Sequence, residues 1–208
     1  MNIIKPSYKI MDEIDRDKIL KNLERYGRTC YKSEDKITPD SASKFVRNIM
    51  KRGHESVIEH EKITVKIICD RGVSHEIVRH RLASYSQSST RYCAYNNERF
   101  GGEITCIDPC FWEKESLIHF KWKMAMLEAE KTYMWMLENG ATPEQARSVL
   151  PNSLQAELVM TMNLREWRHF FKMRTQKAAH PQMREIAVPL LKEFQKKLPE
   201  IYDDIVIE

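Results

Sequence analysis

Two stretches of alternating apolar and polar residues, far apart in the chain, most constrain how it can fold. In the first, Ile63, Val65 and Ile67 alternate with polar residues, and the second runs over 155–162. A period of two is typical of half-buried strands. Helical patterns lie between and around these strands without a regular strand–helix repeat. The sequence therefore predicts an α+β fold.

Helical spacing and capping residues predict most of the other elements. In the first part of the chain, helices are expected over 15–26 with a stop at Gly27, from Thr38-Pro39 up to Gly53, and over 111–139. Two more are expected to follow caps: one after the capping box at 142–145, and one from the Asn163-x-x-Glu166 cap past Phe171. A last helix is expected over 180–198, with a kink or break at Pro189. A short helix from Arg71 is expected to carry Glu76, Arg79 and His80. A serine-rich loop and then a strand over 91–95 are expected to follow it.

Composition places the chain among globular proteins. With 208 residues, 42% of them hydrophobic and 31% charged, it can bury a substantial core, and we expect a single domain over 1–208. The net charge of +4 favours small anionic ligands over nucleic acid. The cysteines are Cys30, Cys69, Cys93, Cys106 and Cys110. They include no Cys-x-x-Cys pair, so neither a zinc site nor a redox motif is indicated. Reduced thiols and a cytoplasmic location are expected, with no membrane span or targeting segment.

The segment 79–91, Arg-His-Arg-Leu-Ala-Ser-Tyr-Ser-Gln-Ser-Ser-Thr-Arg, is the most informative for function. Arginines offer forked donors to phosphate and carboxylate oxygens, and small hydroxyl residues leave backbone amides accessible to a ligand. The segment is too polar for a core, so the pattern indicates close contact with an anionic ligand. The same residues can also be interpreted as a solvated basic face or as a stripe that binds RNA or DNA phosphates.

The order of these residues resembles the signature of the flavin-dependent thymidylate synthases (the ThyX family). That signature is Arg79-His80-Arg81, seven residues, then Ser89 and Arg91. Further segments resemble the same family in the same order: 53–60, 146–151, and Asn163-Leu164-Arg165 with His169 and Arg174. The similarity spans residues 54–174. It implies an antiparallel or mixed central sheet flanked by long helices.

The resemblance implies the reductive methylation of dUMP to dTMP. In this reaction 5,10-methylenetetrahydrofolate donates the carbon, reduced FAD donates the hydride, and NADPH reduces the flavin. No protein cysteine is expected to attack the uracil ring, and Cys93, the cysteine nearest a motif, is interpreted as a buried thiol. The family also implies a homotetramer with sites shared between subunits. The Met- and aromatic-rich helix over 111–139 is a candidate subunit contact, or equally part of the monomer core.

The resemblance assigns individual residues to two ligands. Flavin contacts are expected from His54, Ser56, Arg79, His80, Arg81, Gln87, Asn163, Leu164, Arg165 and His169, of which His54 and Ser56 would also lie near the folate. Contacts with dUMP are expected from Glu76, Ile77, Val78, Arg79, Gln87, Ser88, Ser89, Thr90, Arg91, Arg147 and Arg174. Arg174 is the predicted catalytic residue, because a fixed guanidinium stabilises the uracil imide as it loses its proton. Without the resemblance, the favoured interpretation of Arg174 is a solvated arginine late in a helix.

Three positions depart from the usual family pattern. Gln87 stands where several relatives carry Glu, His169 where they carry Asn, and Glu76 where some carry Gln. These differences put individual contacts in question rather than the activity. The chain lacks Gly-x-Gly-x-x-Gly, which excludes a Rossmann cradle, and no metal site is expected; a metal face of His75, Glu76 and His80 is a weaker alternative. A flavin enzyme that methylates another pyrimidine, including one in RNA, stays open.

Overall fold

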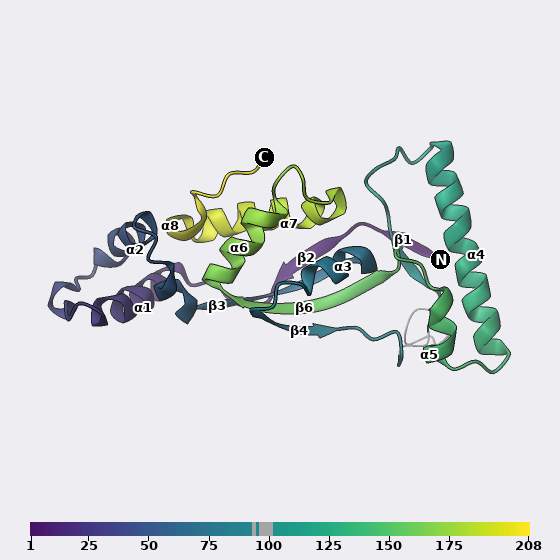
Figure 1. Ribbon diagram of the computed structural model, residues 1–208, viewed down its shortest axis with the longest axis horizontal. Helices are drawn as coiled ribbons and strands as arrows, with labels where there is room; N and C mark the ends of the chain where they lie inside the picture. Colours follow the sequence, from purple (N-terminus) through teal and green to yellow (C-terminus); the bar gives the residue numbers. More distant parts are fainter. Residues whose placement is uncertain (93–94, 96–101) are drawn as a thin grey trace. The chain divides into compact units, whose positions relative to one another are not determined.

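The computed structural model describes residues 1–92, 95 and 102–208 of the chain (Figure 1). By its internal contacts the chain divides into two compact units. Unit 1 comprises Met1–Ser7, Ile67–Arg79 and Tyr85–Val159, and unit 2 comprises Tyr8–Lys66, His80–Ser84 and Met160–Glu208. Both contain helices and strands in irregular order, so the predicted α+β class is confirmed.

Four strands form a sheet in the order β2-β3-β6-β4. They are β2 (Ser7–Ile10), β3 (Lys62–Asp70), β4 (Ala83–Gln87) and β6 (Gln155–Asn163). Near the start of β3 and the end of β6, the hydroxyl oxygens of Thr64 and Thr161 lie 3.0 Å apart. Just after the end of β3 and just before the start of β6, the Arg71 amide donates to the Leu154 carbonyl at 3.1 Å. Strands β3 and β6 therefore run antiparallel. Their alternating burial confirms the two strands predicted from the period of two.

Unit 1 contains a second, smaller sheet and the longest helix of the part of the chain that the structure describes. Strand β1 (Asn2–Ile4) pairs in parallel with β5 (Thr105–Ile107). The helices are α3 (Arg71–Ile77), α4 (Leu117–Glu138) and α5 (Pro143–Ala146), followed by the 3-10 helix η4 (Arg147–Val149). Thr142 accepts from the Gln145 amide before α5, which confirms the predicted capping box.

Unit 2 packs its helices around an aromatic core. They are α1 (Arg16–Thr29), η1 (Glu34–Lys36), α2 (Ser41–Lys51), η2 (Glu55–His60), α6 (Leu164–Arg174), α7 (Pro181–Lys197) and α8 (Pro199–Tyr202). The buried rings of Trp167, Phe171 and Phe194 lie 5.0 to 5.6 Å apart, centroid to centroid. The Trp167 indole donates to the Ile63 carbonyl at 3.0 Å, which joins α6 to β3. Aromatic burial of this kind fixes the orientation of α6, the helix that carries Arg165, His169 and Arg174.

Helix α1 continues through Gly27, so the prediction that Gly27 ends it was wrong. A Cβ at this position would lie 2.7 Å from the ring of Phe45 on α2. The glycine is needed for the close approach of two helices rather than for a left-handed turn. By contrast, Gly53 and Gly140 follow α2 and α4 with φ of 72° and 90°, as expected for helix-ending glycines.

Several other predicted boundaries were also wrong. Helix α3 ends at Ile77, before Arg79 and His80, and α4 begins at Leu117, where Ser116 caps it by accepting from the His119 amide. Residues 83–87, expected in a loop, form strand β4 at the edge of the four-stranded sheet. Its small polar residues suit an edge strand because alternate side chains reach solvent. Helix α2 begins only at Ser41. Pro189 lies inside α7 and does not interrupt the helix, whereas a kink at this position stays a prediction.

The expected strand over 91–95 falls largely outside the described residues. Arg91, Tyr92 and Tyr95 lie in turns, which contradicts a strand at these positions, whereas residues 93–94 and 96–101, Cys93 among them, lie outside. No disulfide joins the described cysteines, which are at positions 30, 69, 106 and 110. Within the described ranges no helix is both long and apolar enough to cross a membrane.

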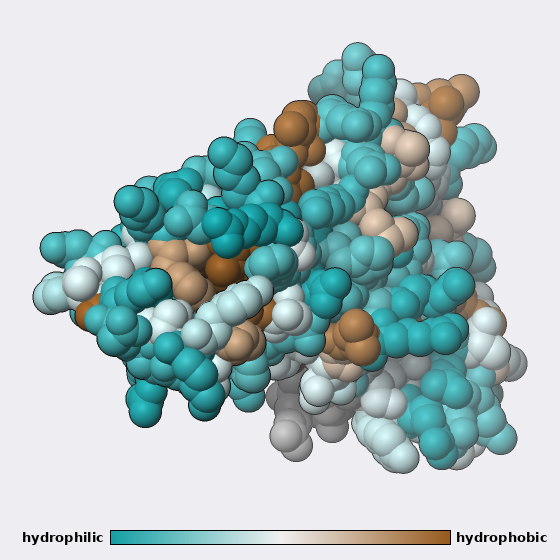
Figure 2. Space-filling view, turned by 60° about the vertical axis from the view of Figure 1, so that its left-hand side comes forward, coloured by the Kyte–Doolittle hydropathy of each residue, from teal (hydrophilic) through white to brown (hydrophobic). Residues whose placement is uncertain are grey.

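Helix α4 leaves much of its apolar surface exposed. The side chains of Leu117, Ile118 and Trp135 are 72%, 57% and 62% exposed, whereas His119 and Tyr133 are buried. On the face drawn in Figure 2, hydrophobic side chains form separate patches among hydrophilic ones. Only part of α4 therefore packs into the core of unit 1.

Candidate active site

The predicted site residues divide between the two units. Unit 2 contains His54, Ser56, His80, Arg81, Asn163, Leu164, Arg165, His169 and Arg174. Unit 1 contains Glu76, Ile77, Val78, Arg79, Gln87, Ser88, Ser89, Thr90, Arg91 and Arg147. Most predicted flavin contacts thus lie in unit 2, and all predicted dUMP contacts except Arg174 lie in unit 1.

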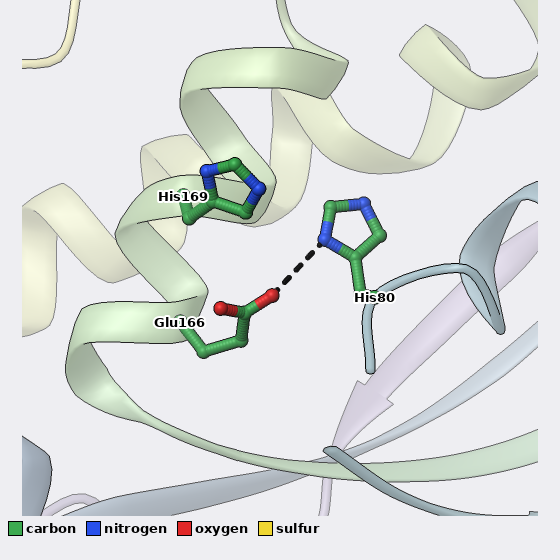
Figure 3. Close-up of side chains that lie close together, drawn as sticks. All are labelled: His80, Glu166 and His169. Carbon is green, nitrogen blue, oxygen red and sulfur yellow. Dashed lines mark hydrogen bonds and ion pairs between the residues drawn. The ribbon is translucent and has the colours of Figure 1, made fainter. Parts of the chain in front are cut away.

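In unit 2 the buried His80 ring lies beside Glu166 and His169 of α6 (Figure 3). Its Nδ1 lies 3.2 Å from Glu166 Oε1, and its Nε2 accepts from Arg174 Nε at 3.1 Å. The His80 and His169 rings meet edge to face, with 5.6 Å between their centroids. The structure thus brings together three predicted site residues, His80, His169 and Arg174, and adds Glu166.

The spacing of residues along α6 explains this grouping. Glu166, Phe170 and Arg174 follow one another at intervals of four residues, so they share one helix face, and His169 lies beside them. The helix begins at Leu164 because the Asn163 side chain accepts from the Glu166 amide at 2.8 Å, which confirms the predicted cap. One well-capped helix thus presents a carboxylate, an imidazole and a guanidinium to His80.

Burial decides the charge of this cluster. Burial first, and then the electrostatic effects of Arg174 and His169, together lower the pKa of His80 to about 4. Burial also raises the pKa of the Glu166 carboxyl above its usual value, against the opposing effect of His169. At neutral pH the His80 ring is therefore uncharged, and it can both donate and accept a hydrogen bond.

The same cluster also has the composition of a metal site. Ligand atoms of His80, Glu166 and His169 lie within 4.8 Å of one another, the one such group of three in the described part of the chain. This group contains neither His75 nor Glu76, the residues that the weaker alternative combined with His80. The sequence missed this grouping because Glu166 and His169 are far from His80 along the chain.

A cavity of about 470 Å³ lies in unit 2 beside the start of η2. It is lined by Gly27, Cys30, Tyr31, Phe45, Asn48, Ile49, Arg52, Gly53, His54, Glu55, Ser56, Val57 and Arg165. Three predicted flavin contacts, His54, Ser56 and Arg165, thus share one cavity. Its volume lies within the range of roughly 300–1,000 Å³ that is typical of small-molecule sites. Aromatic and aliphatic walls with a few polar groups suit a planar, partly anionic ligand.

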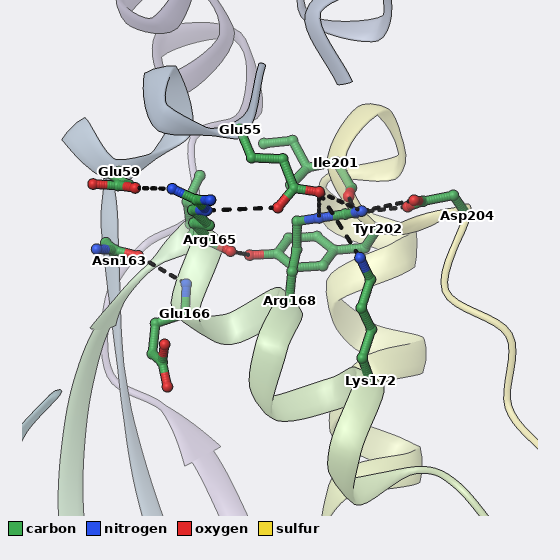
Figure 4. A network of polar contacts seen from close by, with 11 residues as sticks. Glu55, Glu59, Asn163, Arg165, Glu166, Arg168, Lys172, Ile201, Tyr202 and Asp204 are labelled. Carbon is green, nitrogen blue, oxygen red and sulfur yellow. Dashed lines mark hydrogen bonds and ion pairs between the residues drawn. The ribbon is translucent and has the colours of Figure 1, made fainter. Parts of the chain in front are cut away.

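Ion pairs hold the wall of this cavity (Figure 4). Arg165 Nη1 lies 2.6 Å from Glu59, and its Nε lies 3.8 Å from Glu55. Glu55 also meets the buried Arg168 at 3.1 Å and Lys172 at 3.8 Å. The cluster therefore ties η2 to α6 through a shared carboxylate.

Two predicted flavin contacts have structural roles of their own. Leu164 is fully buried; its amide donates to the Glu61 carbonyl at 3.0 Å, and its carbonyl accepts from the Tyr202 hydroxyl at 3.1 Å. Asn163 caps α6, as described above. Arg81, by contrast, is exposed.

In unit 1 four of the predicted dUMP residues, Ser88, Ser89, Thr90 and Arg91, follow strand β4, which ends at Gln87. The Ser88 amide donates to the Glu157 carbonyl at 2.8 Å, and Gln87 donates to the Ser74 hydroxyl at 3.3 Å. Both contacts hold this segment against neighbouring elements.

Arg91 is directed towards the segment that carries Arg147. Its Nη2 lies 3.2 Å from Glu144 of α5, and η4 begins with Arg147 three residues further on. Thr90 is buried, whereas Arg79, Arg91 and Arg147 are exposed. Glu76 is half-buried, Ile77 is buried, Val78 is exposed and Ser89 is half-buried. Two predicted nucleotide arginines are thus brought to one part of unit 1.

The fold is α+β, and the predicted site residues of both units include several arginines. The sequence model of the thymidylate synthase complementing protein family matches residues 13–200. The chain is 40% identical to the flavin-dependent thymidylate synthase of Pyrococcus abyssi over 166 residues. This aligned region covers 79% of this chain and 67% of that protein. It is 34% identical over 189 residues to the Geobacter sulfurreducens protein of the same name, and this aligned region covers 86% of this chain and 78% of that protein. The chain belongs to this family, and the resemblance inferred from its motifs is confirmed.

Proposed function

We propose the following reaction for this flavin-dependent thymidylate synthase: reductive methylation of dUMP to dTMP with 5,10-methylenetetrahydrofolate as the carbon donor and NADPH as the reductant. FAD, when bound and reduced, supplies the hydride. The observation that carries the proposal is the contact of Arg174 with His80. It sets the predicted catalytic guanidinium in a cluster with two predicted flavin residues, His80 and His169.

The cavity in unit 2 supports flavin binding. His54, Ser56 and Arg165 supply a ring, a hydroxyl and a guanidinium along its wall, and Tyr31 and Phe45 supply apolar surface. A flavin nucleotide has an apolar ring system and an anionic pyrophosphate, so this chemistry fits it. The start of α6 adds backbone N–H groups that favour an anion.

Arg174 would act on the uracil ring by stabilising charge. A guanidinium held in place stabilises the imide anion as it forms and so increases electron density at carbon 5, where the new carbon attaches. Because the Arg174–His80 bond occupies Nε, it fixes the plane of the guanidinium. No cysteine nucleophile is needed in this scheme, and the buried Cys69 and Cys106, whose pKa values burial raises, are unsuited to that role.

Binding of dUMP is assigned to unit 1. Ser88, Ser89 and Thr90 would surround the phosphate with hydroxyl and amide donors, and Arg91 and Arg147 would add positive charge. The turn over Ser89 to Arg91, in which the Arg91 amide donates to the Ser89 hydroxyl at 3.2 Å, supports this arrangement.

Two further expectations stay predictions. We propose one functional domain, working as a homotetramer with shared sites, and the exposed apolar residues of α4 support a contact between subunits. A cytoplasmic location is likewise proposed and rests on the expected reduced thiols.

The first experiment is an absorption spectrum of the purified protein followed by an assay. We expect flavin absorption that is released on denaturation, and dTMP formation that requires dUMP, methylenetetrahydrofolate and NADPH together. Arg174→Ala should keep the flavin and lose dTMP formation by roughly 100- to 1,000-fold, the usual cost of one such donor. Arg25→Ala, at an exposed position of α1 outside the cavity, is the matched control and should retain activity.

Other outcomes separate the alternatives. A colourless protein that binds oligonucleotides with a steep salt dependence would indicate a nucleic-acid module instead. Turnover with dCMP or a uridine-containing oligonucleotide, but not with dUMP, would indicate another pyrimidine as the substrate. Near-normal turnover in Arg174→Ala would remove Arg174 from the catalytic role.

A further inference from the structure

We propose that Glu166 is a positioning residue of the active site: through His80 it fixes the direction of the Arg174 guanidinium. The inference rests on the function proposed above, in which Arg174 is the catalytic group. The family motifs give Glu166 no role beyond its place in the first turn of α6.

The positions of the protons follow from the two hydrogen bonds of His80. A guanidinium stays protonated at all relevant pH values, so Arg174 Nε can only donate. The atom that faces it at 3.1 Å, His80 Nε2, must therefore be an acceptor. A neutral imidazole carries one N–H, which is then on Nδ1, and Nδ1 lies 3.2 Å from Glu166 Oε1. The three side chains form a directed chain in which Arg174 donates to His80 and His80 donates to Glu166.

Glu166 stabilises the tautomer in which Nε2 accepts from Arg174, because its carboxylate accepts from Nδ1. If the acceptor at Nδ1 is removed, the ring can place its proton on Nε2 instead, where it would face another donor. The side chains of His80 and Glu166 are only 3% and 8% exposed, so water has little access as a substitute acceptor. Loss of Glu166 would therefore release Arg174 from its orientation.

The Glu166 carboxylate is itself held in place by α6. Its backbone amide is bound by the Asn163 cap, and its residue lies in the first turn of the helix, where a negative charge is favourable. The carboxylate and Arg174 lie two turns apart on the same helix. One rigid element thus supplies both ends of the chain, and His80 bridges them from a separate segment.

The hydrogen-bonded chain accounts for these atoms better than a metal ion does. A metal bound by His80, Glu166 and His169 would need a ring nitrogen of His80 with a free lone pair directed at it. The two bonds above engage both nitrogens. The Arg174 cation, in hydrogen-bond contact with the same ring, would also repel a divalent ion.

The test uses Glu166→Met, which removes the acceptor, and Glu166→Gln, which keeps an acceptor of the same reach without charge. ¹⁵N NMR of the histidine rings in flavin-loaded protein distinguishes a protonated from an unprotonated ring nitrogen. We expect the proton of His80 on Nδ1 in the wild type and in Glu166→Gln. In Glu166→Met we expect a mixture of tautomers or a proton on Nε2.

Binding of dUMP to the flavin-loaded protein gives the functional readout. We expect Glu166→Met to weaken dUMP binding by about tenfold, the effect of losing one orienting hydrogen bond, and Glu166→Gln to remain close to the wild type. In an Arg174→Ala background, Glu166→Met should have no further effect, because its action passes through Arg174. A purely structural role of Glu166 would instead give additive losses.

Four results would overturn the positioning role. The first two are a wild-type His80 with its proton on Nε2 and a shift of the His80 signals on adding one equivalent of Zn²⁺. The other two are unchanged dUMP binding in Glu166→Met and additive losses in the double variant. Absence of dTMP formation by the wild type contradicts the proposed reaction. A working wild type with an unaffected Glu166→Met variant contradicts the positioning role alone.

Discussion

Arg168 and Asp204 form a two-pronged ion pair, with Nη1–Oδ1 at 2.6 Å and Nη2–Oδ2 at 2.7 Å (Figure 4). Arg168 also donates to the Ile201 carbonyl and lies 3.1 Å from Glu55. The guanidinium is buried, and it joins α6 to the C-terminal segment and to η2. Since η2 carries Ser56 and follows His54, Arg168 supports the cavity wall without lining it.

We expect Arg168→Met to destabilise the fold by about 2–4 kcal/mol, because it removes the donor to the buried Ile201 carbonyl and to the half-buried Glu55 carboxylate. Chemical denaturation at neutral pH measures this loss. Arg165→Met is the comparison: Arg165 is exposed and pairs with the exposed Glu59, so its loss should cost less than about 1 kcal/mol. Equal losses in the two variants would contradict the structural role of Arg168.

The burial of His80 predicts a loss of stability in mild acid. Its pKa is about 4 in the folded protein and 6.5 without the fold, so between these pH values the unfolded chain binds a proton that the folded chain excludes. The contribution of the uncharged His80 ring to the free energy of unfolding is full above about pH 6.5. It is lost as pH falls towards 4, and its upper limit is about 3 kcal/mol.

Denaturation curves between pH 7 and pH 4 test this window. His80→Gln removes the titrating ring and should flatten the dependence of the unfolding free energy on pH between about 6.5 and 4.5. Burial raises the pKa of the Glu200 carboxyl, but hydrogen bonds from Arg16 and Ser43 outweigh it and lower the pKa, and the hydrogen bond from Arg168 lowers the pKa of Asp204. These two carboxyl groups therefore lose their contribution to stability only at lower pH. An equally steep slope in the wild type and in His80→Gln would show that His80 does not control this window.

The sequence was most reliable where one physical signal acts alone. Strands β3 and β6 alternate because one face is buried, and the caps at Thr142 and Asn163 follow from short side chains that satisfy free amides. These features depend on neighbouring residues only. They could be predicted from the chain without knowing what lies across from it.

The predictions failed where a distant residue decides the structure. Gly27 was expected to end α1, but Phe45 on another helix determines its role. The contact of Glu166 with His80 spans 86 positions and leaves no periodic signal. The family motifs identified Arg174 and His80 separately, whereas their mutual contact required the fold.

The approach of α1 to α2 at Gly27 makes a steric prediction. Alanine at position 27 should gain up to about 1 kcal/mol in helix propensity, but its Cβ would meet the Phe45 ring. That ring is also held by Arg28, whose guanidinium carbon lies 4.9 Å from the ring centroid. We expect Gly27→Ala to be net destabilising by about 1–2 kcal/mol.

A double variant isolates that clash. Adding Phe45→Leu should make Gly27→Ala less costly than it is in the wild type, a coupling that thermal or chemical denaturation detects. If Gly27→Ala raises stability, the two helices can separate without loss and the close approach is not required.

Asn163 allows the capping role to be separated from the proposed flavin contact. Its side chain accepts from the Glu166 amide, so Asn163→Ala should lose about 1 kcal/mol of stability. Asn163→Asp keeps the cap and adds a negative charge at the helix start, which preserves or raises stability. If flavin phosphates bind at this helix start, the same carboxylate repels them, and flavin affinity should fall by at least about tenfold. Fluorescence titration with flavin and denaturation of both variants measure the two effects side by side. Flavin binding by Asn163→Asp that equals the wild type would leave Asn163 with the capping role alone.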